Sequence, residues 1–311
     1  MAYVLLVVGF FMLIKGADLF VDGSSSVAKL FKVPSVIIGL TIVAMGTSAP
    51  EAAVSITAGI TGNNEIAISN VIGSNMFNLL IVVGLCAAIK AFASNKDILK
   101  RDFPFCIGIT TMLFFFVLDK EVSRIDGIIF LVVFVAYLVM MIQSALKNRE
   151  TEQEEEKKLS LVKSVIFIVV GIAAIVFGGD LVVDNASEIA AQFGLSQTLI
   201  GLTIVAVGTS LPELVTSIVA AVKGESAMAL GNVVGSNIMN ILFILGASSA
   251  IHPIKTVGEN IVDAGLMLIS TIMVYIYCKS GKRVDRGEGI VCVILYVIYT
   301  GYIITRSLHL L

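Results

Sequence analysis

The stretch GLTIVAMGTSAPE at residues 39–51 decides the fold, because it occurs a second time as GLTIVAVGTSLPE at residues 201–213. A second motif, NVIGSNMFN at residues 70–78, returns as NVVGSNIMN at residues 232–240. Both pairs are related by the same offset of 162 residues, without a gap. Chance similarity between two apolar segments does not match Gly, Ser, Thr, Asn, Pro and Glu position by position. The chain is therefore a duplication of one unit.

The composition places both copies in a membrane. Of the 311 residues, 57% are hydrophobic and 14% are charged, whereas an average soluble domain has about 45–50% apolar and about 25% charged residues. This composition disfavours a soluble enzyme, and a net charge of −2 lacks the basic footprint of a nucleic-acid-binding protein. A spanning helix needs about 20 mostly apolar residues. The apolar segments predict ten spans, at residues 2–28, 35–60, 66–89, 103–118, 125–146, 161–188, 197–222, 227–251, 259–278 and 287–305.

The predicted fold class is an all-α integral membrane protein, with ten transmembrane helices arranged as two inverted five-helix repeats. The first repeat covers residues 1–146, the second covers residues 161–311, and an acidic linker of residues 147–160 separates them. Because five spans lie between equivalent points, and five is odd, the second copy enters the membrane in the opposite orientation. Inverted repeats are typical of secondary transporters, which bind their substrate near the midplane between the halves.

Loop charges predict the orientation of the chain, because cytoplasmic loops carry an excess of lysine and arginine. Basic residues concentrate on the connections after the odd-numbered spans, for example Lys96, Lys100 and Arg101 after the third. We therefore expect both termini outside the cell and the linker in the cytoplasm, in a multi-pass protein of the cell membrane. The charged linker is either a solvated connection or a regulatory cation site.

Two glutamates lie near the middle of predicted membrane spans, where a charge is most unfavourable. Glu51 and Glu213 fall near the middle of their spans, where an ionised carboxylate has to face the interior and find a partner. Pro50 and Pro212 precede them and lack the N–H that continues a helix, so each turn is expected to break the helix and free backbone carbonyls. A simple proline kink, with glutamates hydrogen-bonded for packing, is the competing interpretation. The same turns supply the hydroxyls of Thr47, Ser48, Thr209 and Ser210.

The second motif adds further oxygens to the set. Each copy places a serine and an asparagine four residues apart, on one helix face; these are Ser74, Asn78, Ser236 and Asn240. The adjacent Asn75 and Asn237 suit helix packing as well as ion binding. Ca²⁺ takes about 6–8 oxygen ligands in flexible geometry, whereas transition metals prefer nitrogen or sulfur. An all-oxygen set in the membrane therefore predicts a Ca²⁺ or Na⁺ site.

A third duplicated feature is a pair of aspartates in each copy, Asp18 with Asp22 and Asp180 with Asp184. With the orientation above, the first pair lies toward the cytoplasmic end of its span and the second toward the outer end. The pairs form either cation funnels at two mouths or ordinary interfacial and capping carboxylates.

GTSAPE with GSNMFN, repeated as GTSLPE with GSNIMN, resembles the two α-repeats of the sodium/calcium exchanger family, over essentially the whole chain. The resemblance implies antiport of Na⁺ and Ca²⁺ by alternating access, with the first and sixth spans moving across the core, without enzymatic activity and without a cofactor. The implied partners are the lipid bilayer and the two ions, with no nucleic acid and no required oligomer. By the same resemblance the ions are held by Thr47, Ser48, Glu51, Ser74, Asn78, Thr209, Ser210, Glu213, Ser236, Asn240 and the carbonyls of Ala44 and Ala206.

One departure from the family pattern concerns the charge of the site. The potassium-dependent branch carries an aspartate at a position matching Asn78 or Asn240, and both are asparagine here, which disfavours K⁺ dependence. Two ionised glutamates then balance one Ca²⁺ or two Na⁺, and a third Na⁺ leaves excess charge. A proton-driven Ca²⁺ antiporter uses the same fold and stays open as an alternative. A cation channel is a further alternative, against which the inverted repeat argues.

Overall fold

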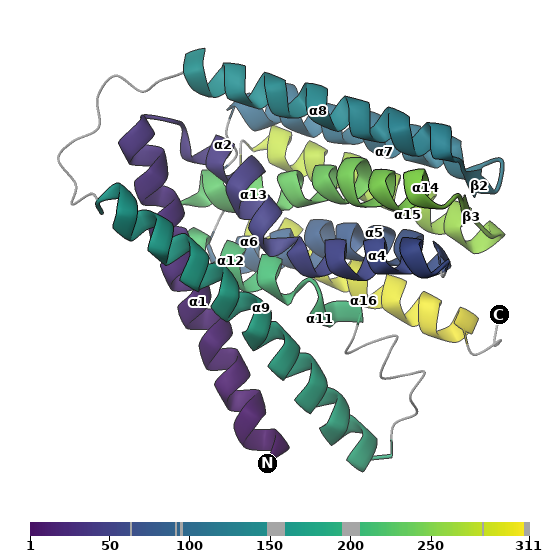
Figure 1. The fold of residues 1–311 in the computed structure, drawn as a ribbon, viewed down its shortest axis with the longest axis horizontal. Coiled ribbons are helices and arrows are strands. Elements are labelled where there is room, and N and C mark those ends of the chain that lie inside the picture. The colour runs from purple at the N-terminus through teal and green to yellow at the C-terminus, as the bar shows by residue number, and fades with distance from the viewer. Residues whose placement is uncertain are drawn as a thin grey trace.

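The computed structural model describes residues 1–62, 64–90, 92–93, 96–147, 159–194, 206–281 and 283–307. This part of the chain is a helical bundle with two short strand pairs (Figure 1). The helices of the first half are α1 (Ala2–Phe31), α2 (Ser35–Ile38), η1 (Gly39–Val43), α3 (Ala44–Thr47), α4 (Ala49–Thr61), α5 (Asn64–Phe77), η2 (Asn78–Val82), α6 (Val83–Ile89), η3 (Ile98–Asp102), α7 (Phe103–Val117) and α8 (Arg124–Lys147). Those of the second half are α9 (Leu161–Gln192), α11 (Ala206–Gly208), α12 (Leu211–Val222), α13 (Ser226–Met239), η5 (Asn240–Leu245), α14 (Gly246–Ile251), α15 (Gly258–Ser280) and α16 (Arg286–Ser307), where η marks a π-helical segment.

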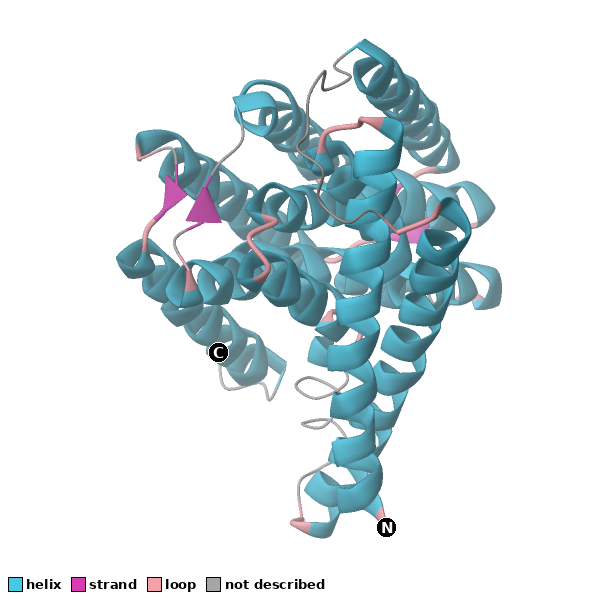
Figure 2. Cartoon of the chain, turned by 90° about the vertical axis from the view of Figure 1, so that its left-hand side faces the viewer, coloured by secondary structure: helices cyan, strands magenta, loops and turns pink. Residues whose placement is uncertain are grey.

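The two longest helices, α1 and α9, pack against each other as an antiparallel pair that projects from the rest of the bundle (Figure 2). Glycines make this contact possible. A Cβ added to Gly9 would lie 2.9 Å from the carbonyl oxygen of Gly178, and one added to Gly16 would lie 2.9 Å from that of Gly171. Small residues at such positions let two membrane helices approach backbone to backbone, so α1 and α9 pack closely against each other.

Replacement of Gly171 by alanine is expected to destabilise the α1–α9 pair. The new Cβ would lie 2.8 Å from the Gly16 carbonyl oxygen and 2.8 Å from the Phe20 backbone nitrogen, and overpacking of this kind costs about 1–3 kcal/mol. Thermal unfolding in detergent measures the effect as a lower Tm. Gly301→Ala in α16 is the matched control, because its Cβ would meet no described atom within 4 Å. Equal Tm values for the two variants would contradict the close packing.

The helix that carries the first decisive motif is broken as its proline predicts. The segments Ser35–Thr47 and Ala49–Thr61 meet at an angle of 54°, and Ser48 between them has φ −81° and ψ 11°, outside the helical range. Pro50 stands in the first turn of α4, where its missing N–H and fixed φ are tolerated. The second copy repeats the break between α11 and α12, at Thr209 and Ser210.

The helices that carry the second motif form the centre of the bundle. In the helical stretches Glu65–Ile89 and Ser226–Ile251, 72% and 94% of the most apolar 18-residue segment is buried. In Arg286–Arg306, at the periphery, the same share is 17%. Both central stretches change from α- to π-helix at the motif asparagine, Asn78 in one and Asn240 in the other. Such π-helical insertions are frequent at functional sites, because they shift the direction of the following side chains.

Two short antiparallel ladders connect the halves at the ends of the bundle (Figure 2). The strands are β1 (Phe92–Ala93), β2 (Glu121–Val122), β3 (Ile254–Lys255) and β4 (Arg283–Val284). In the first ladder Phe92 pairs with Val284, and in the second Val122 pairs with Ile254. The offset of the sequence duplication relates Phe92 to Ile254 and Val122 to Val284, so the two ladders are equivalent contacts between the copies.

Seven described helices are long and apolar enough to cross a membrane, or eight when the bent pair at Ser48 is taken as one span. Two predicted spans account for the difference from ten. The span at 103–118 corresponds to α7, which has 15 residues. The first part of the span at 197–222, residues 197–205, lies outside the described part of the chain. The count of ten and the inverted repeats therefore stay predictions, as does the linker, since residues 148–158 also lie outside the described residues.

Candidate cation-binding site

The two motif glutamates lie next to the broken turns, with their side chains inside the bundle. Glu51 lies in the first turn of α4 and Glu213 in the first turn of α12, and both side chains are fully buried. The first turn of a helix presents unpaired backbone N–H groups and the positive end of the helix dipole, which favour a carboxylate there. Each break in the chain therefore serves to place one acidic group inside the bundle.

Serines from both copies hold one oxygen of each glutamate. The Ser210 hydroxyl donates to Glu51 Oε1 at 3.0 Å, and the Ser74 hydroxyl to the same oxygen at 3.4 Å. In the equivalent arrangement Ser48 donates to Glu213 Oε1 at 2.8 Å and Ser236 at 3.4 Å. Every glutamate thus receives one hydroxyl from its own copy and one from the other copy. The site exists only where the two halves meet.

Four buried oxygens of this cluster have no hydrogen-bond partner among the described residues: Glu51 Oε2, Glu213 Oε2, Asn78 Oδ1 and Asn240 Oδ1. A buried acceptor without a partner costs about 1–3 kcal/mol, and more when it is charged. Two carboxylate and two amide oxygens are hard ligands suited to Ca²⁺ or Na⁺. Among the described residues no group of three or more His, Cys, Asp or Glu side chains gathers as a metal site, so neutral oxygens have to complete any cation shell here.

Asparagines 75 and 237 fix the direction of the unpaired amide oxygens. The Asn78 amide nitrogen donates to Asn237 Oδ1 at 3.1 Å, and that of Asn240 donates to Asn75 Oδ1 at 2.9 Å. Asn75 and Asn237 each also donate to the backbone carbonyl of the other, at 3.4 Å. The sequence alone is compatible with either helix packing or ion binding for Asn75 and Asn237. The structure shows that they pack the central helices and, by the same contacts, orient Asn78 and Asn240.

Replacement of Asn237 by alanine is expected to weaken Ca²⁺ binding about tenfold or more, the usual effect of removing a residue that orients a metal ligand. Asn237 Oδ1 accepts the hydrogen bond of the Asn78 amide nitrogen and so directs Asn78 Oδ1 into the cluster; the variant loses this contact. Isothermal titration of the purified protein with Ca²⁺ measures the loss. Asn260→Ala, which removes a side-chain cap at the start of α15, is the control for a lost asparagine hydrogen bond outside the cluster, and an equal affinity in both variants would argue against the orienting role.

A further duplicated pair, Asn70 and Asn232, was not among the predicted site residues. The Asn70 amide donates to the Ser55 hydroxyl at 2.9 Å, and the Asn232 amide donates to the Ser217 hydroxyl at 3.0 Å. Each contact ties a motif helix to the glutamate-bearing helix before it. Both asparagines open the second motif in the sequence, so their own repetition at the common offset was the available signal.

The two threonines of the broken turns differ from each other. Thr47 is fully buried, and its hydroxyl lies 3.1 Å from both the Val43 carbonyl oxygen and Asn232 Oδ1. Thr209 is half-buried, and its hydroxyl has no partner among the described residues.

The backbone carbonyls predicted as ligands differ in the same sense. The Ser48 N–H donates to the Ala44 carbonyl at 3.0 Å, whereas the Ser210 N–H donates to Val207 at 3.1 Å, one residue nearer in sequence. The Ala206 carbonyl therefore does not accept the hydrogen bond from Ser210 that would correspond to the Ser48–Ala44 bond of the first copy. For Ala206 only the backbone, in α11, belongs to the described structure.

A cleft of about 440 Å³ reaches the second turn from one side of the bundle. It is lined by residues of α4, α9, α11 and α12, among them Pro50, Val54, Asp180, Asp184, Thr209 and Pro212. Asp180 and Asp184, expected from the sequence to be either funnel or capping carboxylates, thus line the same cleft as Thr209 of the second broken turn.

Comparison with known proteins agrees with this geometry. The family model for sodium/calcium exchanger proteins matches residues 1–143 and 163–305. The chain is 38% identical to the putative antiporter CaxA of Alkalimonas amylolytica, over 96% of this chain and 97% of that protein. It is 32% identical to the sodium/calcium exchanger MaX1 of Methanosarcina acetivorans, over 96% and 97% of the two chains.

A solved structure of the sodium-calcium exchanger NCX_Mj matches the fold with a TM-score of 0.86 and 31% identity, covering 97% of this chain and 98% of that one. The resemblance inferred from the duplicated motifs is thereby confirmed. The protein is a multi-pass helical membrane protein, and it belongs to the sodium/calcium exchanger family of cation antiporters.

Proposed function

We propose that the protein exchanges Na⁺ for Ca²⁺ by alternating access, at one site shared by both halves. The observation that carries the proposal is the set of four buried oxygens on Glu51, Glu213, Asn78 and Asn240 that have no hydrogen-bond partner in the described part of the chain. We assign the ion ligands to these four residues together with Thr47, Ser48, Ser74, Thr209, Ser210, Ser236 and the carbonyls of Ala44 and Ala206. No cofactor and no oligomer enters this mechanism.

Obligatory exchange follows from the charge of the site. The empty cluster carries two buried carboxylates, and a buried unpaired charge is strongly unfavourable in a membrane protein. One Ca²⁺ or two Na⁺ neutralise it and permit the closed intermediate in which neither mouth is open. The unloaded site resists the same transition, so an ion moving one way requires an ion moving the other way. Movement of the α1–α9 pair across the core switches the open side.

The membrane arrangement belongs to the same proposal. Ten spans form two inverted five-helix repeats, residues 1–146 and 161–311, joined by the linker at 147–160. Both termini lie outside the cell and the linker lies in the cytoplasm, as the loop charges predict. In this orientation the cleft at Asp180 and Asp184 opens to the outside.

The test uses the purified protein in lipid vesicles loaded with Na⁺. Dilution into Na⁺-free buffer containing ⁴⁵Ca²⁺ is expected to produce uptake that is absent from protein-free vesicles and from vesicles with equal Na⁺ on both sides. If a pH gradient drives uptake and a Na⁺ gradient does not, the coupling ion is H⁺ and not Na⁺. Ca²⁺ flux without any ion on the opposite side would identify a channel and overturn the proposed exchange.

A further inference from the structure

The two ends of the ion path are in different states. At the open end, Val54 lines the cleft and is 40% exposed. The residue at the matching position of the second copy, Thr216, is 0% exposed. Asp180 and Asp184 are exposed at the cleft. The matching Asp18 and Asp22 keep 41% and 49% of their side-chain surface exposed, but both are bound by Lys223 at the end of α12, against which α1 packs. One mouth is open and the equivalent mouth is closed.

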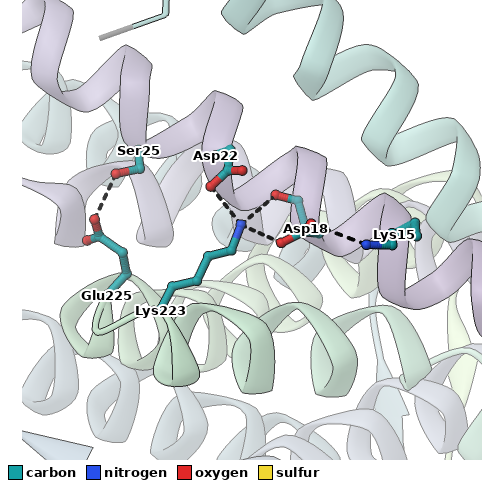
Figure 3. Close-up of polar contacts among 6 residues, drawn as sticks. All are labelled: Lys15, Asp18, Asp22, Ser25, Lys223 and Glu225. Carbon is teal, nitrogen blue, oxygen red and sulfur yellow. Dashed lines mark hydrogen bonds and ion pairs between the residues drawn. The ribbon is translucent and has the colours of Figure 1, made fainter. Parts of the chain in front are cut away.

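An ion-pair cluster holds the closed mouth (Figure 3). The ammonium of Lys223, just beyond the end of α12, binds the carboxylates of both Asp18 and Asp22 on α1, the latter at 2.6 Å. It also donates to the Asp18 backbone carbonyl at 3.0 Å. Two residues further on, Glu225 accepts a hydrogen bond of 2.7 Å from Ser25, again on α1. These contacts tie the start of the α12–α13 connection to α1 across about 200 residues of sequence.

The contacts of Lys223 favour its charged form. Partial burial lowers the pKa of Lys223, but the hydrogen bonds to Asp18 and Asp22 raise the pKa further, so that it lies above the usual lysine value. Lys15, the other basic residue near Asp18, lies 4.0 Å away on the same helix. This ion pair therefore lies within α1, whereas the ion pairs of Lys223 connect α1 to the end of α12.

The sequence does not repeat this cluster in the other copy. The aspartates are duplicated, but the position that matches Lys223 is occupied by Thr61 and the position that matches Glu225 by residue 63, an asparagine. Of the two matching positions, 61 and 223, only position 223 carries a lysine. Opening the mouth at Asp18 has to break the two ion pairs of Lys223. Closing the mouth at Asp180 cannot form an equivalent ion pair at position 61, because threonine carries no charge.

We propose that Lys223 is a one-sided latch, which holds α1 on α12 and biases the conformational equilibrium toward the state with the Asp180 mouth open. The inference rests on the proposed alternating access. It assigns Asp18 and Asp22 to the latch in this state, and only Asp180 and Asp184 to the approach of ions. Exchange then requires the latch to open once in each cycle.

Labelling of introduced cysteines with a water-soluble maleimide tests the latch in detergent-solubilised protein, where both faces are accessible. Thr216→Cys reports the closed mouth and Val54→Cys reports the open mouth, at matching positions. Adding Lys223→Gln is expected to speed labelling of Thr216→Cys by roughly threefold to tenfold, the factor that two partly exposed ion pairs supply, and to slow that of Val54→Cys. The four native cysteines are buried, and their background is subtracted with protein lacking the new cysteine.

Two matched variants sharpen the result. Lys15→Gln removes a lysine beside Asp18 without releasing α12, so it should leave both labelling rates unchanged. The exchange Lys223→Thr with Thr61→Lys moves the lysine to the other copy and should reverse the preference, protecting Val54→Cys and exposing Thr216→Cys. An unchanged rate at Thr216→Cys in the Lys223→Gln variant would overturn the latch, as would an effect of Lys15→Gln of the same size.

The labelling readout is independent of the coupling ion. Absence of Na⁺-driven Ca²⁺ uptake in native vesicles would remove the proposed Na⁺/Ca²⁺ exchange while the labelling rates still report the latch. Conversely, normal uptake together with unchanged labelling would leave the exchange intact and remove the latch alone.

Discussion

Glu213→Gln is expected to reduce Na⁺-driven Ca²⁺ uptake by about a hundredfold or more. The variant keeps the size of the side chain, so the hydrogen bonds that Ser48 and Ser236 donate retain an acceptor. It removes one of two buried negative charges, and loss of one partner from a buried charge pair costs about 3–5 kcal/mol, which is a factor of a hundred or more in affinity. Ca²⁺ in the variant site would leave an uncompensated positive charge inside the bundle.

Initial rates of ⁴⁵Ca²⁺ uptake into Na⁺-loaded vesicles measure the effect, with Ca²⁺ titration as a second readout. Glu51→Gln should behave alike, because the two glutamates occupy equivalent places in the two copies. Glu121→Gln is the control, since this glutamate is exposed in β2. Uptake by Glu213→Gln within twofold of the native protein would rule out the glutamate pair as the shared site.

Asn240→Asp is expected to make exchange sensitive to the membrane potential. The native cluster carries two carboxylates, so two Na⁺ and one Ca²⁺ balance it equally, and exchange of two Na⁺ for one Ca²⁺ moves no net charge. A third carboxylate at position 240 accommodates a third Na⁺, and three Na⁺ against one Ca²⁺ moves one charge per cycle. One charge is worth about 2.3 kcal/mol per 100 mV, which is roughly a fiftyfold change in the Ca²⁺ ratio at equilibrium.

Vesicles clamped with valinomycin and K⁺ gradients provide the measurement. The native protein should reach the same ratio of internal to external Ca²⁺ at 0 and at −100 mV, while the variant should differ between the two by a factor approaching fifty. Asn78→Asp is the equivalent change in the other copy and should act in the same way. A steep potential dependence of the native protein would show that a third positive charge already enters the site.

Much of the site could be predicted from the sequence, because its chemistry is local. A proline inside an apolar helical segment cannot continue the helix before it, and the 54° bend at Ser48 was predictable from Pro50. A carboxylate repeated in the middle of two apolar segments has to be buried and paired, and Glu51 and Glu213 are buried. The broken turn of the second copy, by contrast, differs from the first in its contacts although the motif is almost the same: the Ser210 N–H donates to Val207, whereas Ser48 donates to Ala44. Nearly identical motifs therefore do not determine these contacts.

What the sequence determined by itself was the duplication, the membrane environment, the broken turns and the identity of the oxygen donors, since each depends on residue type and spacing. Only the tertiary structure decided which residues meet. Ser48 lies three residues from Glu51 yet donates to Glu213, Asn75 binds Asn240, and Lys223 binds the aspartates of α1. A common offset states which positions are equivalent, but contacts between residues some 160 to 200 apart depend on how two copies pack and on which mouth of the packed pair is open.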